Sequence, residues 1–147
     1  MDEADIAIRN LTYQLFVGTG RTPTVDDVAI VAGTTAREIE GAWQRLSDAH
    51  ALVLQGGTTQ LRMLNPFSNV ETAYRVQAGG RWWYANCAWD AFGICAALHV
   101  DGHVETVCLD CGHAIDVSVR HGRADDESFV FHCLVPAVQW WDDIVFT

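Results

Sequence analysis

Apolar residues in the first part of the chain recur at helical spacing and then give way to short strand-like runs. Residues 5–17 place apolar side chains close to a 3.6-residue period, which predicts a helix that ends at the glycines after it. Thr24 is suited to cap a short second helix to about residue 32, and a third is expected over residues 35–49. Residues 51–64 predict a hairpin that turns at a Gly-Gly pair, so the order is that of a winged helix.

The pattern breaks at residues 65–69, NPFSN, where Pro and Asn predict a linker. Asn86 is then expected to cap a helix over residues 87–100, which is apolar nearly all round and should therefore be buried. Alternating or apolar runs predict strands at 71–80, 81–86, 103–110, 113–120 and 128–135, and residues 140–147 close the chain.

These elements predict an α+β protein made of two parts. A winged-helix-like module at residues 1–64 would pack on a small mixed or antiparallel β-sheet domain with a buried helix at residues 65–147. A chain of 147 residues is long enough for one compact unit or for two very small subdomains that share a core.

Charge weighs against nucleic acid as a partner of the winged-helix-like module. The net charge is −10, and no basic stripe is visible that could displace counterions from phosphate. The helix expected at 35–49 would be the DNA-recognition helix of such a module. It carries three acidic residues, Glu38, Glu40 and Asp48, against two basic ones, Arg37 and Arg45. The module is therefore expected to pack against the rest of the protein, with a winged-helix regulator as the less favoured alternative.

Composition also excludes several kinds of enzyme and suggests a compartment. All nine basic residues are arginine, so neither a Schiff-base lysine nor a P-loop lysine exists, and no GxGxxG supports a dinucleotide fold. The N-terminus is acidic and no run reaches the roughly 20 apolar residues of a membrane span. With five cysteines and no secretion signal, we expect a cytoplasmic protein without a membrane partner, whose cysteines are thiols, metal ligands or catalytic groups.

Cys87 and Asp90 form the first candidate pair for chemistry. Cys87 would lie in the first turn of the apolar helix, where unpaired N–H groups stabilise a thiolate and lower its pKa. Asp90 follows at i+3 on the same face, so a nucleophilic or metal-binding sulfur would sit beside a proton-carrying carboxyl group. The spacing alone favours a simpler alternative, a buried structural cysteine beside a helix-capping aspartate.

Cys108 and Cys111 form a CxxC between two predicted strands, as in one half of a zinc site. Structural zinc needs four ligands, and no spacing shows which residues would complete the set from Cys87, Cys95, His113 and His132. Cys133 lies in a predicted strand beside His132, so the two side chains would point to opposite faces.

Several segments together resemble the organomercurial (alkylmercury) lyase family: RWWYANCAWDAFGICAAL, TVCLDCG and SFVFHCLVPAVQWWDD, after the winged-helix-like start. The resemblance implies cleavage of a carbon–mercury bond, as in mercury resistance: thiolates bind mercury and a proton passes to the departing carbon. By position, Cys87 would be the mercury-binding thiol and Asp90 the proton shuttle, whereas Cys108 matches a family cysteine with a structural role. The substrate would be a small organomercurial, without an organic cofactor, and a cytosolic thiol or a reductase would accept the Hg(II) product.

The second catalytic cysteine of the family has no clear counterpart. Alignment places Ser128, Val130 or a neighbour there, and Cys133 is the nearest thiol, although strand parity would turn it away from Cys87. Family members also continue with a strand and a helix beyond Thr147. Cys133 could take the role and hold mercury with Cys87, the protein could be impaired, or the scaffold could serve other chemistry.

Two further functions follow from the last possibility. One is a lyase that uses Cys87 and Asp90 on a non-mercury substrate. The other is a non-catalytic metal-binding protein that holds Hg(II), Cu(I) or Zn(II) through Cys87, Cys108, Cys111 or Cys133.

Overall fold

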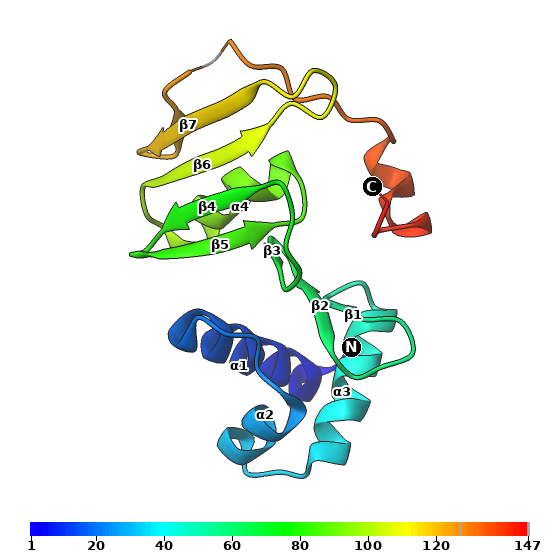
Figure 1. Ribbon diagram of the computed structural model, residues 1–147. Coiled ribbons are helices and arrows are strands. Elements are labelled where there is room, and N and C mark those ends of the chain that lie inside the picture. The colour runs from blue at the N-terminus through cyan, green and yellow to red at the C-terminus, as the bar shows by residue number, and fades with distance from the viewer. Residues whose placement is uncertain (127, 147) are drawn as a thin grey trace.

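The first three helices gather at one end of the molecule, and most of the twisted sheet lies at the other (Figure 1). The computed structural model describes residues 1–126 and 128–146. The last residue of the expected closing segment 140–147, Thr147, therefore lies outside the described residues. The helical end consists of α1 (Glu3–Thr19), α2 (Val25–Ala32) and α3 (Ala36–Asp48), followed by the hairpin strands β1 (Val53–Leu54) and β2 (Leu61–Leu64). These elements follow the order that the hydrophobic pattern predicts.

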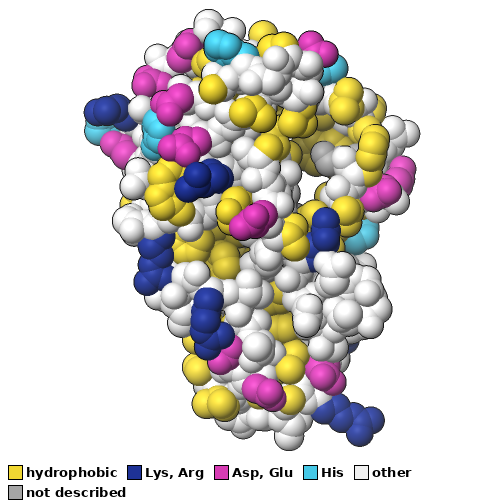
Figure 2. Space-filling view, in the orientation of Figure 1, with side chains coloured by type: hydrophobic (Ala, Val, Ile, Leu, Met, Phe, Trp, Pro, Cys, Tyr) yellow, Lys and Arg dark blue, Asp and Glu magenta, His cyan; other side chains and the backbone are white. Residues whose placement is uncertain are grey.

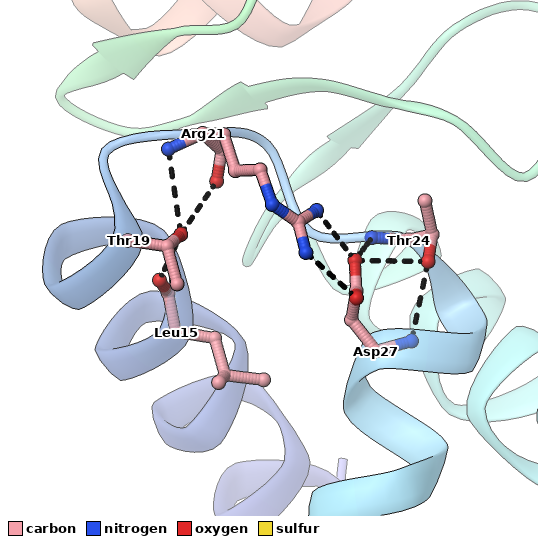
Figure 3. A network of polar contacts seen from close by, with 5 residues as sticks. All are labelled: Leu15, Thr19, Arg21, Thr24 and Asp27. Atoms are coloured by element: carbon pink, nitrogen blue, oxygen red, sulfur yellow. Dashed lines mark hydrogen bonds and ion pairs between the residues drawn. The ribbon is translucent and has the colours of Figure 1, made fainter.

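Capping boxes begin each of these helices. In α2, the Thr24 hydroxyl accepts a hydrogen bond from the Asp27 N–H at 3.1 Å, and the Asp27 carboxylate accepts one from the Thr24 N–H at 2.8 Å. The Asp27 carboxylate also accepts hydrogen bonds from both terminal guanidinium nitrogens of Arg21, at 2.7 and 2.8 Å (Figure 3). The Thr19 hydroxyl donates to the Leu15 carbonyl, so the turn from α1 to α2 is held at both sides.

The carboxylates in these caps lead us to expect that the free energy of unfolding declines in acid. The pKa of Glu38 falls to about 2, because the hydroxyl of Thr34 and the amide and hydroxyl of Thr35 donate to its carboxylate. Hydrogen bonds from Arg21 and Thr24 likewise lower the pKa of Asp27. A carboxyl group whose pKa is depressed by folding stabilises the native state above its unfolded pKa of about 4, and this contribution is lost as pH falls toward the folded value.

We therefore expect the urea midpoint of unfolding to drop between pH 5 and pH 2. Glu38→Gln should lower the midpoint at pH 7 and flatten this pH dependence, because it removes one of the titrating groups. The exposed Glu71, replaced by Gln, is the matched control. A midpoint that does not change between pH 5 and pH 2 would contradict the role given to the caps.

Among the described residues, the strands form one eight-stranded sheet in the order β1-β2-β3-β5-β4-β6-β7-β8, and every pairing is antiparallel. Beyond the hairpin, the strands are β3 (Phe67–Ser68), β4 (Arg75–Ala78), β5 (Arg81–Ala85), β6 (Gly102–Val107), β7 (Ala114–Arg120) and β8 (Arg123–Ala124). The protein is thus α+β, as predicted.

The segment expected to be a linker is instead a strand. In β3, Phe67 pairs with Leu64 of β2 on one side and with Ala85 of β5 on the other. Both β3 side chains are buried, because the strand joins the hairpin to the larger part of the sheet. The sheet therefore runs across the expected boundary between residues 64 and 65, and the division into two domains stays a prediction.

Aromatic rings join the helical end to the sheet. Phe16 of α1, Phe67 of β3 and Trp83 of β5 form a cluster in which every pair of ring centroids lies 5.2 or 5.3 Å apart. Nearby in α3, Trp43 is 1% exposed and its indole N–H donates to the Thr12 hydroxyl at 3.0 Å. One hydrophobic core therefore spans both ends of the molecule.

The helix that follows β5 lies against one face of the sheet (Figure 1). This helix, α4 (Ala88–Leu98), buries Ala91, Ile94 and Cys95, while Trp89 on its other side is 63% exposed. Its burial is therefore one-sided, because only the face toward β4, β5 and β6 is covered. Within the described residues, no helix combines the length and the apolar character that crossing a membrane would require.

The strand predicted over residues 128–135 does not form. Residues 128–135 contain no helix or strand and lead into the short 3₁₀ helix η1 (Ala137–Asp142). Trp141 of η1 stacks on His50, with ring centroids 4.2 Å apart and planes 3° from parallel. This contact brings the C-terminal segment beside the end of α3.

Candidate active site

A cavity of about 450 Å³ lies between the start of α4, the C-terminal segment and the hairpin. Figure 2 shows a hollow with mostly hydrophobic colouring on the side of the C-terminal segment. The lining is largely apolar and includes Met63, Tyr74, Trp89, Leu109, Phe131, Leu134, Trp140, Trp141 and Ile144. The few polar groups that reach it include Asn86, Cys87, Asp90 and Cys133, so the cavity combines apolar walls with a small polar centre.

Cys87 stands at the N-terminus of α4, as its N-cap residue. The expected cap, Asn86, lies one position earlier, so this boundary prediction was wrong by one residue. The Cys87 carbonyl accepts the first helical hydrogen bond, from the Ala91 N–H at 3.0 Å. The extended backbone at Cys87, with φ −152°, places its side chain beside the first turn of the helix.

The electrostatic environment of Cys87 differs from the expectation. Burial raises the pKa of the thiol above its ordinary value, and the negative charge of Asp90 adds to this effect. The N–H groups of Asp90 and Trp89 lower the pKa but do not outweigh burial. The predicted lowering of the Cys87 pKa was therefore wrong, because desolvation exceeds the helix-terminus effect.

Asp90 lies one turn into α4 and is positioned by Asn86. The Asn86 amide nitrogen donates to the Asp90 carboxylate at 3.0 Å. Burial raises the pKa of Asp90, although the Asn86 amide and the Cys87 thiol oppose this by donating toward the carboxylate. A raised pKa means that Asp90 holds a proton at a higher pH than an exposed aspartate does.

A chain of polar contacts connects this pair to the helical end. The Asn86 amide also contacts the Asn65 side-chain oxygen at 3.3 Å, and the Asn65 carbonyl accepts a hydrogen bond from the Tyr13 hydroxyl at 3.0 Å. The Asn86 side-chain oxygen is buried without a hydrogen-bond partner among the described residues. Sequence reasoning treated Asn86 only as a cap and missed this positioning role, for which its place four residues before Asp90 is the available signal.

Cys133 lines the same cavity as Cys87 and Asp90. It lies in the irregular segment before η1, so the parity argument that turned its side chain away from Cys87 does not apply. Its Sγ contacts the Val135 carbonyl at 3.0 Å, and the residue is exposed. Cys87, Asp90 and Cys133 thus line one cavity, although their ligand atoms do not all lie within 4.8 Å of one another in the described residues.

The remaining cysteines lie apart from this centre. Cys95 is buried in α4, whereas Cys108 and Cys111 lie in the turn between β6 and β7. In the part of the chain that the structure describes, no third histidine, cysteine or carboxylate joins Cys108 and Cys111 at ligand distance. A four-ligand zinc site therefore has no support from this geometry.

One group of possible metal ligands lies elsewhere, on β6 and β7. The ligand atoms of His103, Glu105 and Asp116 lie within 4.8 Å of one another. His103 forms a hydrogen bond with Asp116 at 2.9 Å and Arg75 forms an ion pair with Glu105 at 3.6 Å, so these side chains already have partners. We interpret the group as a surface charge network.

Comparison with known families identifies the family to which the chain belongs. The sequence model "MerB: Alkylmercury lyase" matches residues 67–147, which is more than half of the chain. The chain belongs to the alkylmercury lyase family. The matched region includes Cys87, Asp90, Cys133 and the CxxC turn.

A solved structure shows the same fold. It is described as "Crystal structure of the mercury-bound form of MerB2" and matches with a TM-score of 0.67 at 20% sequence identity. The match covers 86% of this chain and 60% of that chain, so this alkylmercury lyase family member spans less than two thirds of the solved protein. No curated protein matches the chain significantly.

Proposed function

We propose that this protein cleaves the carbon–mercury bond of a small organomercurial by thiolate binding and protonolysis. The observation that carries the proposal is that Cys87, Asp90 and Cys133 all line one cavity of an alkylmercury lyase family member. Residues 65–147 would carry the catalytic groups. Residues 1–64 would be a winged-helix-like support that contributes Tyr13 and Met63 near the cavity.

The chemistry follows from a soft sulfur ligand beside a proton carrier. As the Cys87 sulfur bonds to the mercury of R–Hg⁺, its proton passes to the Asp90 carboxylate. Binding of the Cys133 sulfur displaces a second proton to solvent and increases electron density on mercury. The carbon–mercury bond then breaks, its electron pair stays with carbon, and the Asp90 proton gives R–H, so that Hg(II) remains on the two sulfurs.

The rest of the cavity suits this substrate class. Trp89, Phe131 and Trp140 provide an apolar wall for the organic group, and Trp89 lies 6.2 Å from Phe131 between ring centroids. An external thiol or a reductase would remove Hg(II) by thiol exchange. Because the reaction needs reduced cysteines, we place it in the cytoplasm.

The direct test is release of benzene from phenylmercury by the reduced protein. We expect catalytic release, and we expect Cys133→Ser to slow it by at least about 10-fold, because the second thiolate no longer activates mercury. Val138→Ala is the matched control, since Val138 lies in the C-terminal segment, is 89% exposed and is outside the cavity lining.

Other results would point to the alternative functions. Phenylmercury that binds without benzene release would contradict the lyase and favour a non-catalytic metal-binding protein. If phenylmercury neither binds nor reacts, the Cys87–Asp90 pair would have to act on a non-mercury substrate. Full activity of Cys133→Ser would contradict the second-thiol role and leave Cys87 with Asp90 as the sole centre.

A further inference from the structure

The turn between β6 and β7 holds two thiols that the proposed reaction does not use. Cys108 and Cys111 are three residues apart on this turn, which is closed by the Cys108 N–H donating to the His113 carbonyl at 2.8 Å. The Gly112 N–H donates back to the Cys108 carbonyl at 2.8 Å, and Gly112 adopts a left-handed φ of 71°. The tight turn thus fixes the backbone on both sides of the pair.

The two thiols of this turn differ in their surroundings. The N–H groups of Cys111 and Asp110 lower the pKa of Cys108, and the Cys111 thiol adds to this effect by donating toward the Cys108 sulfur. Cys108 is half-buried and Cys111 is exposed. The pair therefore presents two thiols on one tight turn, one of them exposed to solvent.

The dithiol lies at the edge of the cavity that contains Cys87. Leu109, between the two cysteines in sequence, is part of the cavity lining. Tyr74 lines the cavity as well, and its pKa is raised first by burial and then by the negative charges of both Cys87 and Cys108.

We propose that Cys108 and Cys111 form a second binding site, a two-thiolate site for a soft divalent cation at the rim of the cavity. Its cargo under the proposed function is the Hg(II) product, so the identity of the cargo rests on that function. Hg(II) favours two sulfur ligands in a near-linear arrangement, which a dithiol can supply alone, whereas zinc requires ligands that the described residues do not add.

Transfer from the cavity to the rim is a thiol exchange without any change of oxidation state. Each new bond from mercury to Cys108 or Cys111 forms as a bond to a cavity sulfur breaks. The proton of the incoming thiol passes to the departing thiolate, so atoms and charges balance. The cavity thiols are then free for another substrate, and Hg(II) is exposed to an external acceptor.

The test uses HgCl2 and therefore does not depend on carbon–mercury cleavage. The reduced Cys87→Ser protein is titrated with HgCl2 and then desalted. The mercury that each chain retains is quantified from the ultraviolet charge-transfer absorption of sulfur–mercury bonds. We compare it with Cys87→Ser/Cys108→Ser/Cys111→Ser. The first variant should retain roughly one Hg(II) more per chain than the second.

Equal retention by the two variants would overturn the second site. Circular dichroism verifies folding, and Cys87→Ser/Cys111→Ser serves as a milder variant because Cys111 is exposed on the turn. That variant should also lose the additional Hg(II). Zn(II) offered in place of Hg(II) should not survive desalting, and tight zinc retention would overturn the assignment to a two-coordinate soft cation. Benzene release has no bearing on these outcomes, so a failed lyase test and a failed rim site are distinguishable.

Discussion

Asp90→Asn is expected to abolish benzene release from phenylmercury while leaving phenylmercury bound to the protein. The amide has a shape close to that of the carboxyl group, but it cannot accept the Cys87 proton or deliver one to carbon. Proton transfer by a positioned side chain contributes roughly 10²–10⁴-fold to a rate, so the loss should be at least about 100-fold. Binding should persist because the Cys87 sulfur is unchanged.

Benzene is measured by gas chromatography of a single-turnover reaction, and bound phenylmercury by mass spectrometry of the intact protein. Cys87→Ser should lose both cleavage and the phenylmercury adduct at this position. The difference between the two variants separates the binding role of Cys87 from the proton-transfer role of Asp90. Asp116→Asn is the matched control because that carboxylate pairs with His103 on the sheet, outside the cavity. An Asp90→Asn protein with the wild-type rate would exclude Asp90 as the proton carrier.

Phe67→Ala should have the largest effect on stability. Phe67 is 2% exposed, and its ring packs between Phe16 and Trp83, with both centroid distances at 5.2 Å. Removing a buried phenylalanine side chain costs the lost burial and leaves a cavity, together about 3–5 kcal/mol. Since Phe67 lies in the strand that joins β2 to β5, the loss should loosen the helical end and the sheet together.

Urea unfolding followed by tryptophan fluorescence and by circular dichroism measures this effect. Both probes should report the same lowered midpoint, because Trp43 and Trp83 belong to one core. Phe129→Ala is the control, since Phe129 is 43% exposed in the irregular C-terminal segment. A loss below about 1 kcal/mol would show that Phe67 is not well packed, and two separated transitions would support independent units at residues 1–64 and 65–147.

Local sequence information was sufficient for the helices and for the relation between Cys87 and Asp90. Thr24 with Asp27, and Thr35 with Glu38, form capping boxes whose hydrogen bonds involve residues three apart. Cys87 and Asp90 share a face of α4 for the same reason, because the first turn of a helix brings such residues together. The family resemblance stated from these segments was confirmed by the match over residues 67–147.

Contacts between distant segments could not be predicted in this way. The run at residues 128–135 has the apolar character of a strand, but a strand needs a hydrogen-bonding neighbour, and this segment instead lies over the cavity with Phe131 and Cys133 in its lining. Similarly, residues 65–69 have the composition of a turn, yet Phe67 is buried between two strands.

The sequence by itself determined the first three helices, the Thr24 cap and the spacing of the thiol and carboxyl groups, because these depend on residues a few positions apart. The tertiary structure decided that Cys133 reaches the Cys87 cavity, that Asn86 holds Asp90, and that the pKa of Cys87 is raised. Each of these depends on what surrounds a side chain in space, and burial by segments far away in sequence outweighs the local effect of the helix terminus.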